Sequence, residues 1–272
     1  MATPLYGLLL VGGKSSRMGQ NKAQLIYRDD TPEWLRLHSL LSAVCQSTFL
    51  SHPEDQDFGV PYIADPADGP LAAIHAAQAA HPGARWLVLA CDLPLLDSET
   101  LQNLVEHSNQ THHATGYLSR IDQRIEPLCS IYEPSSRPHI EAALKANTFC
   151  PRSVLESLDT HTLTLPNPHA LDNANSPADA LEVRSHLTQT RSKKSVQIQY
   201  FAQLRELAQC DSESITTECV TASGLYEDLK ARYHFPHKQK QLMLAINDDF
   251  ADWATPLNEG DSIVYIPPVA GG

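Results

Sequence analysis

The sequence lacks an excess of positive charge, and this limits what the protein can bind. Its 272 residues include 20 Lys and Arg against 32 Asp and Glu, so the formal net charge is −12. A chain with this balance offers no broad basic surface for nucleic acid or for an anionic membrane. One nucleotide needs only a local pocket and remains a possible ligand. We therefore expect neither nucleic acid nor a membrane as a partner.

Long apolar runs and paired cysteine motifs are missing as well. No apolar run reaches the roughly 18 residues that suggest a membrane span, and the first six residues lack the basic segment that opens a signal peptide. The six cysteines are scattered, with no Cys-x-x-Cys. This pattern argues against a zinc ribbon or a disulfide scaffold and suits a reducing compartment. We expect a cytoplasmic protein.

What is present is enough apolar sequence for one large or two modest domains. Hydrophobic residues make up 42% of the chain and charged residues 19%. From Leu5 to about Leu187, strand and helix patterns alternate. Leu8–Val11 and Trp86–Ala90 are typical of buried strands, and Trp34–Val44 and Leu101–Val105 have helical spacing. This alternation predicts a doubly wound, Rossmann-like α/β domain with its site at the carboxyl ends of the strands.

The pattern changes after a polar stretch at 184–195, which has no apolar periodicity. Part of it reads as a linker, or else as the end of a solvated helix. Val196–Tyr200 then alternates with period two, Leu225 and Leu229 suit one short helix, and Ile263–Ile266 reads as a last strand. We therefore expect a second, small α+β domain. The predicted boundaries are 1–188 for the first domain, 189–194 for the linker and 195–272 for the second domain.

A glycine loop follows the first predicted strand directly, in the segment Leu10–Lys22. Gly12 and Gly13 let backbone N–H groups approach a phosphate chain closely. Arg17 and Lys22 add positive charge where the phosphates would lie. The segment is neither a Walker loop nor Gly-x-Gly-x-x-Gly. The residues favour a phosphate site, and the alternative is a glycine turn with solvated basic side chains.

Four segments together resemble a known family. Leu-x-Gly-Gly-x-Ser-x-Arg-Met-Gly-x-x-Lys at 10–22 is similar to the signature of nucleotidyltransferases with a glycosyltransferase-A-like Rossmann fold, and most like that of molybdenum cofactor guanylyltransferase. The Gly-Pro-Leu loop at Gly69, the Cys-Asp-x-Pro element at Cys91 and the segment Asp172–Asp179 agree with this family in order. Asn21 and Ala73 depart from the pattern, because the family often has Asp and Gly there.

The resemblance implies an enzyme that transfers GMP from GTP to molybdopterin, with Mg²⁺ and with release of pyrophosphate. Arg17 and Lys22 would offset charge on the triphosphate, and Asp92 would hold the Mg²⁺, although a buried-strand Asp can also be a helix cap. Asn173 and Asn175 would lie on the acceptor side, or would only start a helix. Asp65 would touch ribose or base, or would only cap its turn. The nucleotide-binding residues implied are Leu10, Gly12, Gly13, Lys22, Asp65, Gly69, Pro70 and Asp92.

A second candidate site is the Gly271–Gly272 tail. Without side chains it can enter a narrow channel and expose its carboxylate, and the alternative is an idle flexible end. The segments Tyr200–Leu207, Ala245–Asn247 and Leu257–Asp261 and the final Pro-Pro-Val-Ala-Gly-Gly resemble the sulfur-carrier subunit of molybdopterin synthase. This resemblance implies a β-grasp, ubiquitin-like domain. An E1-like activating enzyme would adenylate Gly272, and the resulting thiocarboxylate would donate sulfur in the large synthase subunit.

Both resemblances indicate molybdenum cofactor biosynthesis, so we expect a fusion of an enzyme with a carrier. One rival hypothesis is an inactive first domain, with only the carrier at work. Another is a transferase of the same fold that uses CTP or a sugar phosphate. In the carrier domain Phe201 is a candidate partner contact, whereas Tyr265 is expected in the core.

Overall fold

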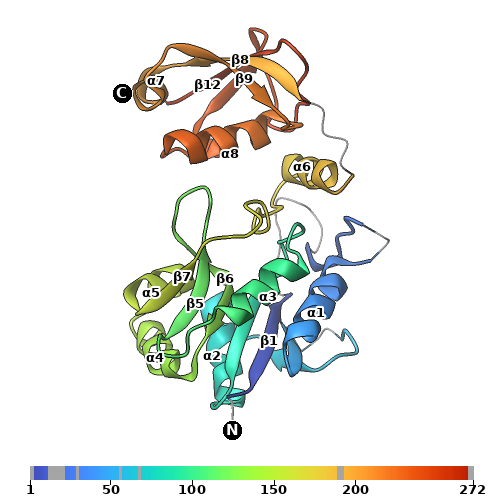
Figure 1. The fold of residues 1–272 in the computed structure, drawn as a ribbon, viewed down its shortest axis with the longest axis vertical. Coiled ribbons are helices and arrows are strands. Elements are labelled where there is room, and N and C mark those ends of the chain that lie inside the picture. The colour runs from blue at the N-terminus through green and yellow to red at the C-terminus, as the bar shows by residue number, and fades with distance from the viewer. Residues whose placement is uncertain are drawn as a thin grey trace. The chain divides into compact units, whose positions relative to one another are not determined.

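The computed structural model describes residues 3–11, 22–28, 31–54, 57–66, 69–188 and 193–268. Two compact units emerge from the contacts within the chain (Figure 1). Unit 1 consists of Met1–Ser119 and Gln123–Asn173, and unit 2 of Arg120–Asp122 and Ala174–Gly272. No helix among the described residues is long and apolar enough to cross a membrane.

Unit 1 is built on a seven-stranded sheet in the order β3-β2-β1-β4-β6-β5-β7. The pairs β3–β2, β2–β1, β1–β4 and β5–β7 are parallel, whereas β6 runs antiparallel to both of its neighbours. The Rossmann-like alternation is therefore confirmed, with one reversed strand inside the sheet. The strands are β1 (Leu5–Leu10), β2 (Ser47–His52), β3 (Tyr62–Ala64), β4 (Arg85–Ala90), β5 (Ala114–Leu118), β6 (Ile125–Tyr132) and β7 (Thr160–Leu163).

Helices cover both faces of this sheet, which is why β1 and β4 are apolar at consecutive positions. One face packs on α1 (Glu33–Val44) and α3 (Ser98–Glu106). The other packs on α2 (Pro70–Ala80), α4 (Arg137–Lys145) and α5 (Pro151–Ser157). Two short 3₁₀ turns complete the unit, η1 (Lys22–Gln24) and η2 (Pro134–Ser136).

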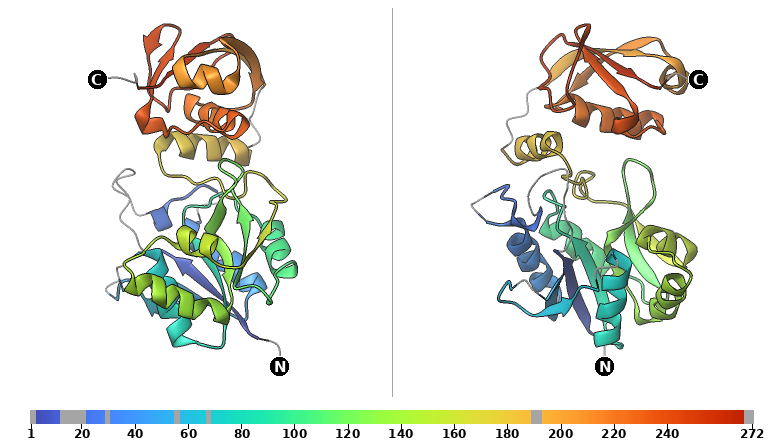
Figure 2. Two further views of the ribbon diagram at one scale, coloured as in Figure 1. Left: turned by 90° about the vertical axis from the view of Figure 1, so that its left-hand side faces the viewer. Right: turned by 180° about the vertical axis from the view of Figure 1, so that it is seen from behind.

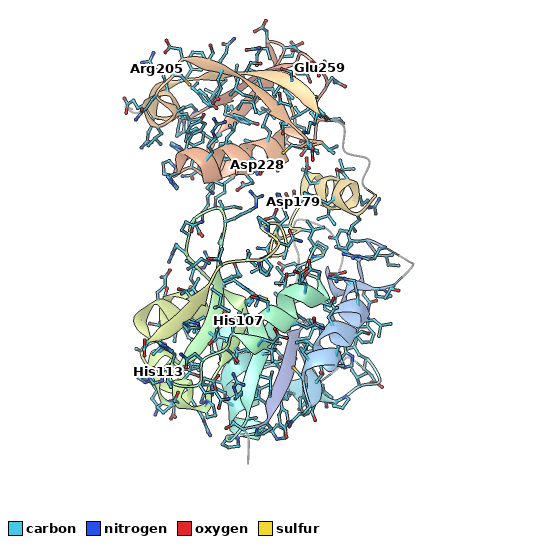
Figure 3. The ribbon with its side chains drawn as sticks, in the orientation of Figure 1. His107, His113, Asp179, Arg205, Asp228 and Glu259 are labelled. Carbon is cyan, nitrogen blue, oxygen red and sulfur yellow. The ribbon has the colours of Figure 1, made fainter. Side chains whose placement is uncertain are left out.

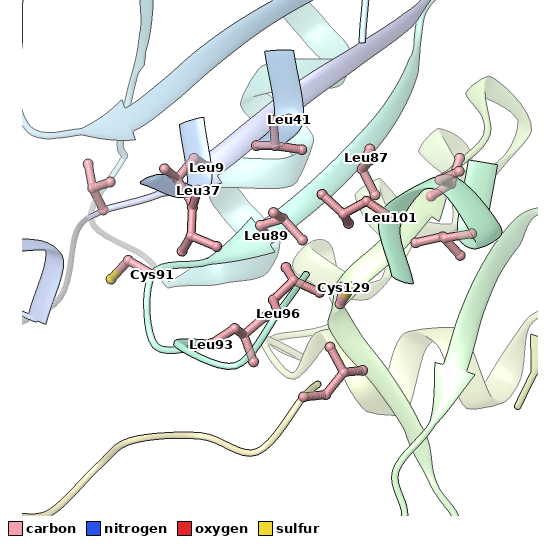
Figure 4. Close-up of a cluster of buried hydrophobic side chains, with 14 of the residues drawn as sticks. Leu9, Leu37, Leu41, Leu87, Leu89, Cys91, Leu93, Leu96, Leu101 and Cys129 are labelled. Carbon is pink, nitrogen blue, oxygen red and sulfur yellow. The ribbon is translucent and has the colours of Figure 1, made fainter. Parts of the chain in front are cut away.

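The core between the sheet, α1 and α3 lies directly under the edge where the site is expected. Leu9 and Leu89 from the strands meet Leu37 and Leu41 from α1 and Leu101 from α3, and all five are fully buried (Figure 4). Each such leucine contributes roughly 1.5–3 kcal/mol through removal of apolar surface from water. The cluster continues along β4 into the segment that follows it, and so ties that segment to the rigid core.

Unit 2 contains a five-stranded sheet in the order β11-β10-β12-β8-β9. The central pair β8–β12 is parallel and the outer pairs are antiparallel. One helix, α8 (Ala222–Tyr233), packs against one face of the sheet (Figure 2). This is the arrangement of a β-grasp fold, as expected. The strands are β8 (Lys194–Tyr200), β9 (Ser212–Thr217), β10 (Met243–Ile246), β11 (Asp249–Phe250) and β12 (Ser262–Ile266), and the other helical elements are α6 (Pro177–Thr188), α7 (Ala202–Ala208) and η3 (Gln239–Gln241).

The start of α6 follows from its local sequence. The Ser176 hydroxyl accepts the backbone N–H of Asp179 at 3.2 Å. The carboxylate of Asp179, which is labelled in Figure 3, accepts the N–H groups of Asn175 and Ser176 at 2.8 and 2.9 Å. These reciprocal bonds satisfy N–H groups that have no partner within the helix. The polar stretch expected from 184 onward thus begins as the last turns of α6, while 189–192 lie outside the described residues.

Candidate active site and carrier tail

The expected site lies at the edge of unit 1 where four parallel strands end together. Leu10, the last residue of β1, is paired with Ser51 of β2 and with Ala90 of β4. The chain leaves β3 at Asp65, whose N–H donates to the His52 carbonyl at 2.9 Å. Asp92 comes two residues after the end of β4. The structure therefore brings Leu10, Asp65 and Asp92 to the same edge of the sheet.

Gly69 and Pro70 form the entry to α2 at this edge. Gly69 has φ +88° and ψ 179°, a conformation that is essentially open only to glycine. Its carbonyl accepts the N–H groups of Ala72 and Ala73 at 3.1 and 3.3 Å, and Pro70 takes the first helical position. The turn is thus set by backbone chemistry, and it presents the N-terminal end of α2, with its partial positive charge, beside the strand ends.

The predicted phosphate loop lies outside the described residues. Gly12, Gly13 and Arg17 fall there, and so does the side chain of Lys22, whose backbone opens η1. Their expected roles stay predictions. What the structure defines is the strand before the loop, with the Val11 N–H donating to the Ser51 carbonyl at 3.1 Å.

Asp92 lies in a segment that α1 holds in place from the side. Arg36 of α1 donates to the carbonyls of Leu96 at 2.8 Å and Leu93 at 3.0 Å. Arg28 donates to the carbonyl of Pro94. Two guanidinium groups therefore bind three backbone carbonyls of the segment Cys91–Leu96. These bonds hold the backbone of the segment that carries Asp92 in place.

The Arg36 guanidinium is itself oriented by Glu33, one helical turn earlier. Arg36 Nε donates to Glu33 Oε2 at 2.9 Å, and the Glu33 side chain is only 1% exposed. Burial raises the pKa of Glu33 above its ordinary value, against the hydrogen bond and positive charge of Arg36, which lower it. Nothing in the sequence marks these two residues, because an i, i+3 pair of opposite charges is common on helices and does not reveal that its carboxylate is buried.

The far end of the same segment is fixed by Asp97. Its carboxylate caps α3 by accepting the Thr100 N–H at 2.8 Å, and it also accepts from Asn167 Nδ2 at 3.1 Å. Burial raises the pKa of Asp97, but the hydrogen bonds from Thr100 and Asn167 outweigh this effect and leave the pKa below its ordinary value. The N-cap residue of α3 is thus Asp97 and not Asp92.

The donor chemistry of the site fits a metal that arrives with a nucleotide. Within the described ranges no group of three or more His, Cys, Asp or Glu side chains could hold a metal ion. Mg²⁺ commonly takes one or two carboxylates and completes its shell with water and substrate phosphates. Asp92, partly exposed at the strand ends, is a carboxylate of this kind.

The two asparagines expected on the acceptor side stand just before α6. Asn173 is exposed, and the N–H of Asn175 takes part in the helix start described above. Asn173 is the last residue of unit 1, and Asn175 belongs to unit 2. Contact of either side chain with an acceptor remains a prediction.

In unit 2 the chain runs out of the sheet toward the predicted tail. β12 ends at Ile266, and Gly271 and Gly272 lie outside the described residues. Tyr265 is fully buried and its hydroxyl donates to the Ala222 carbonyl at 2.8 Å, as expected of a core residue. Phe201 is 49% exposed and thus accessible to a partner.

Comparison with known proteins finds a match for each of the two predicted domains. The family model described as "MobA-like NTP transferase domain" matches residues 7–162, and the model of the ThiS family matches 198–272. A molybdenum cofactor guanylyltransferase of Pseudomonas fluorescens is 30% identical over 182 residues, which are 64% of this chain and 90% of that protein. A "molybdenum cofactor biosynthesis bifunctional protein" of Synechocystis is 34% identical over 184 residues, 65% of this chain. The chain spans about half, 53%, of the length of that relative.

Among solved structures, unit 1 has the fold of "molybdopterin-guanine dinucleotide biosynthesis protein A" from Archaeoglobus fulgidus. The TM-score is 0.58 at 20% identity, over 68% of this chain and all of that one, so this likeness concerns the fold alone. Together the matches confirm the predicted two-part architecture and the expected class of enzyme, a nucleotidyltransferase. The chain belongs to the MobA-like NTP transferase family and carries, at its C-terminal side, a domain of the ThiS family.

Proposed function

We propose that unit 1 transfers GMP from GTP to molybdopterin and releases pyrophosphate. The observation that carries the proposal is the position of Asp92 at the strand ends, in a segment bound by Arg36 and Arg28. Asp65 and the N-terminal end of α2 lie at the same edge. This is the edge at which open α/β sheets bind their ligands.

In the proposed reaction an oxygen of the molybdopterin phosphate bonds to the α-phosphorus of GTP. The bond from that phosphorus to the bridging oxygen breaks, and pyrophosphate leaves with the electron pair. Catalysis of this kind is mostly positioning and neutralisation of charge. Arg17 and Lys22 would neutralise the triphosphate, and Gly12 and Gly13 would let backbone N–H groups reach it.

Asp92 would hold a Mg²⁺ ion together with the phosphates, and the bound ion would supply further positive charge at the α-phosphate. Leu10, Asp65, Gly69 and Pro70 would line the nucleotide pocket. Asn173 and Asn175 would face the acceptor. The rigidity of the 91–97 segment matters here, because misplacement of a catalytic group by about 1 Å can cost about a hundredfold in rate.

The test is conversion of molybdopterin to its guanine dinucleotide by the full chain, with GTP and Mg²⁺, for the wild type and for Asp92→Asn. A matched control is Asp159→Asn, which removes the charge of an exposed carboxylate next to β7. β7 is the outermost strand on the side of the sheet away from β3. We expect Asp92→Asn to lose activity and the control to keep it. Turnover with CTP alone would move the assignment to a cytidylyltransferase, and no turnover with any nucleotide would leave unit 1 without enzymatic activity.

We also propose that unit 2 carries sulfur on the carboxylate of Gly272. The support is its β-grasp fold and a ThiS-family match that extends through residue 272. An E1-like enzyme would adenylate the carboxylate with loss of pyrophosphate from ATP, and hydrosulfide would then replace AMP to leave a thiocarboxylate. The large subunit of molybdopterin synthase would accept the sulfur. A chain without Gly272 should form no thiocarboxylate and support no molybdopterin synthesis, and equal activity of the two chains would contradict the carrier role.

A further inference from the structure

Helix α6 is a bonded part of unit 2 and not a free spacer. Glu182, in the middle of α6, accepts hydrogen bonds from the backbone N–H and the hydroxyl of Thr221, the latter at 3.0 Å. Thr221 is the N-cap residue of α8, and its hydroxyl accepts the Gly224 N–H at 3.2 Å. The carboxylate of Glu182 thus binds the N-terminal end of α8, where a negative charge is favourable.

Gly224 of α8 leaves room for the Glu182 carboxylate because it has no side chain. A Cβ atom on Gly224 would stand 2.6 Å from Glu182 Cδ, so a side chain at 224 would displace the carboxylate. Glu182 is 9% exposed, and Ala178 and Val183 on the same helix are each 3% exposed. A buried carboxylate with hydrogen-bond partners is costly to pull away from them. α6 is therefore fixed on α8 within unit 2.

The start of β8 is anchored at the same end of the unit. Lys194 Nζ donates to the carbonyls of Cys219 at 3.1 Å and Leu257 at 3.0 Å. The Ser195 carbonyl accepts the Gly260 N–H at 2.8 Å. We call this region the junction end, defined by α6, Thr221, Lys194 and Leu257. The segments before residue 189 and after residue 192 are thus both bonded there.

The chain leaves the sheet at the other end. β12 runs parallel to β8, with Tyr265 opposite Tyr200, so both strands finish together, and β8 alone spans roughly 20 Å. At this tail end Met243, opposite Ile266, is 54% exposed and Phe201 is 49% exposed. Figure 1 shows α7 beside the end of β12 and α6 beside the start of β8. These two exposed apolar side chains thus lie at the end from which the tail departs.

We propose that the carrier is charged with sulfur while it is still joined to the transferase. The inference rests on the carrier role proposed above. The proposal is based on two observations. The hydrogen bonds of Glu182 on α6 and of Lys194 hold the chain on either side of 189–192 at the junction end of unit 2. The chain leaves the sheet toward Gly272 at the tail end. Cleavage at 189–192 is then unnecessary, because an activating enzyme can approach the tail end of unit 2 without displacing α6.

The experiment supplies the full chain with an E1-like adenylating enzyme, ATP and hydrosulfide, and follows the mass of the intact chain. Replacement of one oxygen by sulfur at the carboxylate identifies the charged form. A second sample carries a specific protease site at 189–192 together with Glu182→Gln and is cut beforehand, because the bonds from Glu182 to Thr221 would otherwise help to hold the two parts together after the cut. We expect the uncut and cut samples to be charged at rates within about twofold of each other, as independent regions would be.

Three results would speak against the proposal in different ways. Charging of the cut sample alone would overturn it and leave the carrier role intact. Charging of neither sample would overturn the carrier role and this inference with it. In a third arm, Gly224→Ala and Glu182→Gln loosen α6, which faster hydrogen exchange of its amides would report. Charging of these folded variants should also stay within about twofold, and its loss would show that the junction end takes part.

Discussion

On α1, Arg36 pairs with the buried Glu33, with Arg36 Nε 2.9 Å from Glu33 Oε2, and the same guanidinium binds the carbonyls of Leu93 and Leu96 beyond Asp92. One arginine thus joins a buried carboxylate to the segment that carries the candidate catalytic carboxylate. This relationship allows stability and positioning to be tested separately, because the Glu33 carboxylate can be removed together with Arg36 while the two carbonyls still lose their donor.

Replacement of Arg36 by Met should therefore lower both stability and activity. Removing one partner of a buried ion pair leaves an uncompensated charge and typically costs about 3–5 kcal/mol. The double variant Glu33→Leu with Arg36→Met should regain much of that stability, yet its kcat should stay low because the carbonyls of Leu93 and Leu96 still lack their donor. Urea unfolding and guanylyl transfer measured on the same samples check this. Recovery of kcat in the double variant would show that Arg36 acts only through stability.

Gly69→Ala should weaken the entry to α2. The φ of +88° with ψ of 179° is strained for any residue with a Cβ, at a cost on the order of 1–3 kcal/mol. We expect a lower melting temperature and a raised KM for GTP. Gly83→Ala is the matched control, because Gly83 has no positive φ and an added Cβ would meet nothing within 4 Å. Equal loss in the two variants would contradict a special role of the turn at 69.

Asp97 should make unit 1 sensitive to acid. The folded state lowers its pKa, so the ionised carboxylate stabilises the fold above its ordinary pKa of 3.8, and this contribution is lost as the pH falls through the lower folded-state value. Asp97→Asn keeps a capping side chain but removes the charge. The difference in unfolding free energy between wild type and variant should be constant near neutral pH and should shrink in acid. A difference that widens as the pH falls would contradict this assignment.

Cys150 should be the most reactive of the six free thiols. It is exposed, and a hydrogen bond from Ser153 lowers its pKa. Burial raises the pKa of Cys45 to about 12 and raises those of Cys129 and Cys219 further. Because the thiolate is the reactive form, iodoacetamide should label Cys150 first. Peptide mass spectrometry over a time course tests this, with Cys150→Ser as the control that abolishes the fast phase.

Local patterns were enough to predict the elements that carry the site. The strands before the glycine loop and before Asp92 are apolar at consecutive positions, because helices cover both faces of the sheet, and that run is visible in sequence. The start of α6 was predictable for a similar reason, since Ser176 and Asp179 bond within one turn. The reversed direction of β6 was not predictable, because a buried strand looks the same in either direction.

The sequence by itself determined the two-part architecture, the family of each part and the candidate residues at 92 and in the glycine loop, since these depend on local patterns and short motifs. Only the tertiary structure decided that Arg36 holds the Asp92 segment and that Glu182 fixes α6 on α8. Each of these contacts joins residues through space to backbone groups. Such groups have the same chemistry at every position, so no pattern of side chains reveals which of them a distant carboxylate or guanidinium will meet.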